Sequence, residues 1–203
     1  MSKKKETIVF IGRSGSGKGT QITLLKDTLK KNYPETEILH YESGAHFRSF
    51  IKRQGYTSEL MRSVIARGDL APDFITEWLL VDEFVKYLTP DKTLIIDGFP
   101  RTISQALTLH SAMDFYKRGP VKVIHLKVSA EAVKERLLSR GRSDDTEIEI
   151  IERRIAWYNA NTIPVLEYLS RQPQYQVIEV DGERPVEEIH EDIVKLVDDT
   201  IEL

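Results

Sequence analysis

Short apolar runs alternate with longer amphipathic stretches along most of the chain. The apolar runs are rich in Ile and Val and are bounded by polar or turn-forming residues, as buried parallel strands are. They predict β-strands at Thr7–Ile11, Glu37–Tyr41, Thr93–Asp97, Val121–Lys127 and Tyr175–Val180.

The amphipathic stretches between these runs have the period of helices. They predict helices at Thr20–Lys31, Pro72–Leu88, Ile103–Lys117, Ala130–Ser139, Glu147–Arg171 and Val186–Val197. Strands that alternate with helices indicate an α/β fold, in which a parallel sheet is covered on both faces and the crossovers are right-handed.

Two segments break this alternation. Ser43–Gly68 follows the second strand, and its parts Ala45–Gln54 and Ser58–Arg67 both tolerate a helix, so we expect a helical insertion. Gly141–Thr146 is a short charged loop between two helices. No repeat or linker indicates a second full domain, and residues 1–203 are expected to form one domain.

Composition and charge narrow the class of protein. The 203 residues are 40% hydrophobic and carry a formal net charge of −3, without the basic excess typical of nucleic-acid-binding proteins. The chain contains no cysteine, which excludes disulfides and thiolate metal sites. We find no secretory signal and no apolar run near the ~20 residues of a membrane span, and we therefore expect a cytoplasmic protein without a membrane partner.

A glycine-rich segment follows the first strand and precedes a predicted helix. Its glycines allow a tight turn whose N–H groups point at one polyanion, and the helix N-terminus adds a positive dipole end. Lys18 supplies a mobile charge for the β- and γ-phosphates. The hydroxyl that usually follows this lysine directly comes one residue later, at Thr20. The segment predicts a nucleotide-phosphate site at Gly15, Ser16, Gly17, Lys18, Gly19 and Thr20.

The third strand runs into Asp97-Gly98-Phe99-Pro100-Arg101. An acidic residue at the carboxyl end of a central strand lies beside the phosphate loop in such sheets. Asp97 and Thr20 are therefore candidate Mg²⁺ ligands, directly or through water, since hard cations prefer oxygen. Arg101 follows the turn, where its guanidinium can donate two hydrogen bonds to one phosphate.

Together, the segments GxxGSGKGTQ and LIIDGFPRT resemble those of the adenylate kinase family, and the likeness covers nearly the whole chain. The resemblance implies a three-layer P-loop NTPase fold with a five-stranded parallel sheet. It also implies an insertion that binds a nucleoside monophosphate (NMP) at about 43–71, and a short lid at about 139–148. The implied reaction is ATP + AMP = 2 ADP with Mg²⁺, catalysed by a monomer that carries no structural zinc.

The resemblance assigns roles to several arginines. Arg136 would lie against the ATP adenine, and Arg184 would meet the same base through its main chain. The catalytic set implied by the family is Lys18, Arg101, Arg140, Arg142 and Arg154, in which Arg140 also holds ATP and Arg142 and Arg154 also reach the acceptor.

The acceptor site matches the family less closely. The family usually has Thr-Gly-Asp where this chain has Ser43-Gly44-Ala45, so Ala45 removes a carboxylate for which Glu42 is a candidate substitute. Gln105 would read the adenine edge, because its amide both donates and accepts hydrogen bonds. The implied acceptor set is Ser43, Arg48, Leu70, Ala71, Gly98, Phe99, Arg101, Gln105, Arg142 and Arg154.

Phosphoryl transfer by such a site needs in-line positioning and neutralisation of charge, and no general base, since the acceptor phosphate is already anionic. Two alternatives stay open. The same chemistry on UMP, CMP or another NMP is favoured by Glu42, Ala45 and Ala71 and opposed by Thr102 and Gln105. A low-turnover ATP-binding switch is opposed by the nearly complete arginine set.

Overall fold

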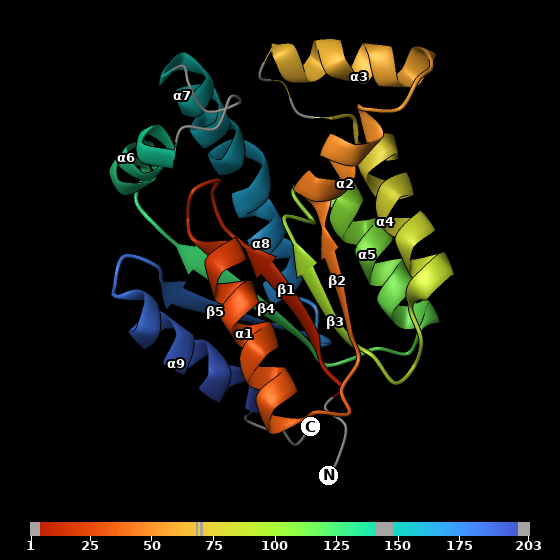
Figure 1. Cartoon of the computed structure of the whole chain (residues 1–203), viewed down its shortest axis with the longest axis vertical. Coiled ribbons are helices and arrows are strands. Elements are labelled where there is room, and N and C mark those ends of the chain that lie inside the picture. The colour runs from red at the N-terminus through yellow and green to blue at the C-terminus, as the bar shows by residue number, and fades with distance from the viewer. Residues whose placement is uncertain (1–4, 68, 70, 141–147, 199–203) are drawn as a thin grey trace.

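The protein, in a computed structural model, is built around one parallel sheet (Figure 1). The structure describes residues 5–67, 69, 71–140 and 148–198. The strand order is β2-β3-β1-β4-β5. The strands are β1 (Thr7–Ile11), β2 (Ile38–Glu42), β3 (Thr93–Asp97), β4 (Val121–Lys127) and β5 (Tyr175–Asp181). The predicted five-stranded parallel sheet is confirmed, with β2 one residue later than expected.

Two apolar cores cover the two faces of the sheet. Successive strand residues point to opposite faces, so Ile8 and Phe10 of β1 enter one core while Val9 and Ile11 enter the other. The first core is closed by α1 (Lys18–Asn32) and α9 (Val186–Asp198). The second is closed by α4 (Asp73–Tyr87), α5 (Ile103–Phe115) and α8 (Ile163–Ser170). The three-layer α/β architecture is therefore confirmed.

Two pairs of helices lie beyond the carboxyl ends of the strands (Figure 1). On one side are α2 (Ser43–Phe50) and α3 (Tyr56–Ala66), which form the expected helical insertion after β2. On the other side are α6 (Ala130–Arg140) and α7 (Ile148–Trp157). Most of the lid segment predicted at about 139–148 lies outside the described residues.

The prediction of a single long helix at Glu147–Arg171 is wrong in the middle of that range. There α7 and α8 are joined by η1 (Tyr158–Thr162), one π-helical turn in which the N–H of Ile163 donates to the carbonyl of Tyr158, five residues back. Pro164 follows directly and has no N–H for the carbonyl of Ala160, so a regular α-helical ladder cannot continue through it. The proline therefore explains the wider turn.

Within the described parts of the chain, none of the helices combines the length and apolar character that crossing a membrane requires.

Candidate functional site

The loop between β1 and α1 surrounds the lysine predicted to bind phosphates. Lys18 Nζ donates to the carbonyls of Gly12 and Arg13, both at 2.8 Å, and lies 3.4 Å from Ser16 Oγ. Ser16 is buried, whereas Gly19 and Thr20 are exposed in the first turn of α1. The ammonium group is thus held inside the loop, in place to exchange carbonyl contacts for those of a polyphosphate.

Glycine is required at Gly15 of this loop. Its φ is +83°, and a Cβ there would meet Leu137 Cγ of α6 at 2.9 Å. A side chain at this position would strain the backbone and collide with a buried leucine. The loop conformation and its contact with α6 therefore both depend on Gly15.

Two oxygen-bearing side chains near the loop suit a hard cation. Asp97 is half-buried at the end of β3, and no described group forms a hydrogen bond with its carboxylate. Thr20 is exposed, and its hydroxyl likewise has no hydrogen-bond partner among the described residues. Mg²⁺ takes oxygen ligands and keeps several waters, so this donor set fits it. No group of three or more His, Cys, Asp or Glu side chains able to hold a metal exists in the described chain.

The turn after β3 fixes Arg101 through neutral partners. Arg101 Nε donates to the carbonyl of Gly98 at 2.7 Å, and Nη2 lies 3.4 Å from Ser43 Oγ. Gly98 has φ +74°, and a Cβ there would lie 2.8 Å from Arg101 Nη2, so the glycine makes room for the guanidinium. Phe99 is fully buried, which leaves only its main chain for a ligand.

The electrostatics of Arg101 point to an anion site. Burial lowers the pKa of the Arg101 guanidinium; Asp97 raises it, and the nearby cation Arg154 lowers it further. None of the described carboxylates forms an ion pair or hydrogen bond with Arg101. Two neighbouring cations, one of them half-buried and without a described carboxylate partner, attract an anionic group of a ligand.

Gln105 lies beside Arg101, but its amide is already engaged. Its Oε1 accepts from the N–H of Arg101 at 2.8 Å, and its Nε2 donates to Asp73 Oδ1 at 2.7 Å. Thr102, which caps α5, donates to the other oxygen of Asp73 at 3.0 Å. Sequence reasoning missed Asp73 as the partner of both residues. Reading a base with Gln105 requires the unused bonding capacity of the amide, or a rearrangement.

Two residues of the predicted acceptor set, Ser43 and Arg48, lie in α2 in different surroundings. Ser43 is buried and donates to the carbonyl of Gly98 at 3.0 Å. Arg48 is exposed and forms a 2.7 Å ion pair with Glu42. Glu42, the candidate substitute for the carboxylate absent at Ala45, is thus already paired with Arg48.

A hollow of about 400 Å³ lies next to this cluster, lined by residues of the α3–α4 connection, α5 and α7. It brings together Ala71 and Arg154 from the predicted acceptor set, with Asp73 and Thr102. Arg153, the neighbour of Arg154, also lines it and donates to the carbonyl of Arg67 at 2.5 Å. The two arginines have different contacts. Arg153 binds the insertion through Arg67, whereas Arg154 acts electrostatically on Arg101.

The predicted base site of ATP is assembled from α6 and the turn after β5. Arg136 donates to the carbonyl of Gly182 at 3.0 Å. The side chain of Arg184 forms a 2.6 Å ion pair with Asp192, and the contact of its main chain with the ATP base stays a prediction. Leu70 and Arg142 lie outside the described residues, and for Arg140 only the main chain at the end of α6 is described.

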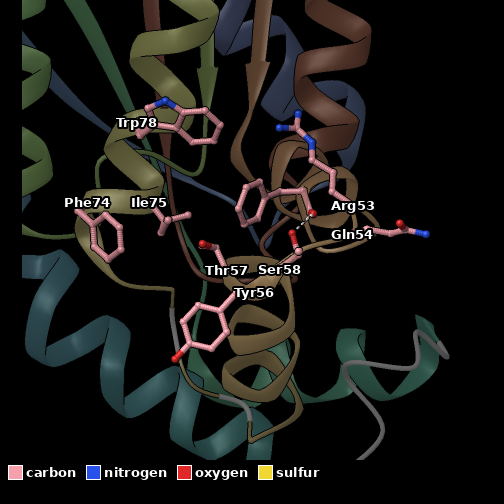
Figure 2. Close-up of a pocket in the computed structure, with 10 residues that line it drawn as sticks. Arg53, Gln54, Tyr56, Thr57, Ser58, Phe74, Ile75 and Trp78 are labelled. Carbon is pink, nitrogen blue, oxygen red and sulfur yellow. Dashed lines mark hydrogen bonds between the residues drawn. The ribbon is translucent and has the colours of Figure 1, made fainter.

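A second hollow, of about 520 Å³, contains none of the predicted site residues. Figure 2 shows it between the α2–α3 connection and α4, where the rings of Tyr56, Phe74 and Trp78 surround it. It is a feature of the insertion and is separate from the residues gathered around Arg101.

The chain matches the family model described as adenylate kinase over residues 10–174. It is 33% identical to Adenylate kinase 1 of Nostoc sp. strain PCC 7120 over 90% of this chain and 93% of that protein. It is 34% identical to Adenylate kinase 1 of Synechocystis sp. strain PCC 6803, over 94% and 96% respectively. It is 35% identical to the adenylate kinase of Azobacteroides pseudotrichonymphae, also over 94% and 96%.

Proposed function

The chain belongs to the adenylate kinase family and is a phosphotransferase of the nucleoside monophosphate kinase type, and from that premise we propose that it transfers the γ-phosphoryl group of ATP to AMP. The observation that carries the proposal is the half-buried guanidinium of Arg101. It lacks a described carboxylate partner and lies beside Arg154 and an open hollow, as a site for an acceptor phosphate requires.

In the proposed reaction the chain supplies position and charge. Lys18 leaves its loop carbonyls for the donor phosphates, and Arg101 and Arg48 hold the acceptor phosphate after Arg48 leaves Glu42. Arg154, with Arg140 and Arg142, closes on the transferred group. Thr20 and Asp97 would hold Mg²⁺ through oxygen and water, and the ion would neutralise the charge that develops on the phosphates.

The lid and the insertion have a proposed role in excluding water. The helices α6 and α7, between which the lid segment falls in the sequence, and the helices α2 and α3 lie beyond the same edge of the sheet, on either side of the phosphate loop (Figure 1). Closing both over bound nucleotides would leave the acceptor phosphate as the available nucleophile. We propose a monomer for this cycle, as the resemblance to the family implies.

A second acceptor is favoured by one specific observation. The amide of Gln105 is already bonded to the N–H of Arg101 and to Asp73, which leaves it less free to read adenine. The same chemistry on UMP or CMP is therefore the competing function.

The test is a coupled assay of ADP formation with ATP, Mg²⁺ and, in turn, AMP, dAMP, GMP, CMP and UMP. The proposal predicts the highest kcat/KM with AMP. A higher value with a pyrimidine nucleotide would reassign the acceptor, and absence of turnover with every nucleotide would favour an ATP-binding switch.

A further inference from the structure

Arg13 is a residue of the phosphate loop whose side chain leaves the loop. Its guanidinium donates to the carbonyl of Val128, after β4, and to Asn159 Oδ1 of η1 at 2.8 Å. It also lies over the ring of Tyr158, 5.2 Å from the ring centre. Its main-chain carbonyl accepts from Lys18 Nζ. Arg13 therefore joins the lysine of the loop to the π-helical turn.

These contacts differ from those of an ordinary surface arginine. An exposed ion pair holds one long side chain weakly. Arg13 is half-buried and is held by a carbonyl, an amide oxygen and an aromatic face on two separate elements. The planar fork of guanidinium suits such a fixed, multi-point contact. A shift of the loop on binding polyphosphate would therefore act on η1.

The same π-helical turn also contacts the acceptor arginine. Thr162, the last residue of η1, is buried, and its hydroxyl donates to the carbonyl of Arg101 at 3.2 Å. A π-turn is wider than an α-turn, so residues three apart diverge further around the axis. Asn159 can thus face the phosphate loop while Thr162 faces the turn after β3.

We propose that Arg13 and Asn159 are positioning residues that couple the donor and acceptor sites through η1. The inference rests on the proposed function. A donor nucleotide bound in the phosphate loop fixes the position of Arg13. Through its bond to Asn159, Arg13 fixes the position of η1, and η1 in turn fixes the position of Arg101 through Thr162. Binding of the donor therefore raises the affinity for the acceptor, and by linkage the acceptor raises the affinity for the donor by the same factor.

The experiment measures that coupling by binding rather than by turnover. AMP is titrated by calorimetry into the full-length protein, alone and with saturating β,γ-imido-ATP and Mg²⁺, and the ratio of the two Kd values is the coupling factor. Asn159→Ala removes the contact to Arg13. Asn161→Ala is the matched control, because Asn161 lies in the same turn but its amide donates to the carbonyl of Trp157 in its own helix.

In the wild-type protein we expect AMP to bind more tightly when the ATP analogue is present. Asn159→Ala should reduce the coupling factor by about twofold or more, in the range measured for residues along a coupling route. Asn161→Ala should leave it unchanged. Arg13→Ala should match Asn159→Ala, and the double variant should add little, because the two residues act through one contact.

A coupling factor that is equal to one in the wild type, or that Asn159→Ala leaves unchanged while both nucleotides still bind, would overturn the inference and spare the proposed function. Loss of thermal stability in Asn159→Ala without a change in the factor would give Asn159 a merely structural role. A wild-type protein that binds neither nucleotide would overturn the proposed function itself.

Discussion

At the scale of single residues, the site depends on cations that carbonyl and hydroxyl oxygens hold in place. Lys18 is bonded to two carbonyls, and Arg101 to one carbonyl and a hydroxyl. The described partners of Arg101 fix its side chain without neutralising its charge, so an incoming phosphate meets positioned positive charge there. Arg48 differs, because its ion pair with Glu42 must break before its guanidinium can contact a phosphate.

Arg101 gives the sharpest prediction at this scale. Arg101→Ala should lower kcat by about 10²–10³-fold, the usual effect of removing one group that stabilises the transition state. The Kd of an ATP analogue should change little, since the role proposed for Arg101 is to hold the acceptor. Steady-state kinetics and calorimetry test both expectations.

Arg62→Ala is the control, because Arg62 lies in the insertion and donates to the carbonyls of Ile51 and Arg53 instead of facing the hollow. The assigned role of Arg101 would be wrong if activity were lost only through unfolding, visible as a fall in Tm that accounts for the whole effect.

At the scale of elements, the strands and most helices were predictable because each has a single clear period. The strands β1, β3 and β4 begin and end as expected, since runs of buried β-branched residues are bounded by polar ones. The break within the helix predicted at Glu147–Arg171 was not predictable from the hydrophobic period, because that period does not reveal a π-turn. Pro164 was the available signal for a break.

The placement of the residues predicted to bind phosphate was easier to predict than the contacts that support them. Lys18, Asp97 and Arg101 stand in motifs that fix them at strand ends. The partners Asp73 and Asn159 lie far from these motifs in sequence, and tertiary packing alone brings them to Gln105 and Arg13. Single-sequence patterns carry no information on such pairs.

A buried lysine on β4 gives a prediction on how the elements are held together. Lys122 is 2% exposed, and its Nζ donates to the carbonyl of Val197 near the end of α9 at 2.9 Å, with Glu6 Oε2 at 3.4 Å. Lys122→Met should lower the free energy of unfolding by about 1.5–3 kcal/mol, the usual contribution of a hydrogen bond to a charged group. Urea denaturation measures this loss.

Lys127→Met is the matched control on the same strand. Its side chain is 63% exposed and pairs with Glu179 at the surface, so the free energy of unfolding should change by less than about 1 kcal/mol. Equal effects of the two substitutions would contradict the role assigned to Lys122.

At the scale of the whole molecule, three buried or half-buried imidazoles link folding to pH. Burial lowers the pKa of His40, His125 and His190 below the ordinary value of 6.5. The unfolded chain therefore binds more protons near and below pH 6.5 than the folded one does. Stability rises with pH under that condition, so it should be full above about pH 7 and fall as the pH drops below 6.5.

Urea denaturation between pH 7.5 and 5.5 tests this expectation, in a window above the titration of ordinary carboxylates. His125→Gln should flatten the slope while keeping a hydrogen-bonding group for Tyr158, whose hydroxyl lies 2.9 Å from His125 Nε2. Stability that is constant or rising as the pH falls through this window would refute it.

The central claim is that the γ-phosphoryl group of ATP goes to a nucleotide and not to water. Its most direct test is ³¹P NMR of the wild-type protein with equal ATP and AMP and excess Mg²⁺. The account predicts two ADP formed for each ATP consumed and an equilibrium mixture of the three nucleotides. Inorganic phosphate accumulating in step with ATP loss, or ATP and AMP left unchanged, would contradict it.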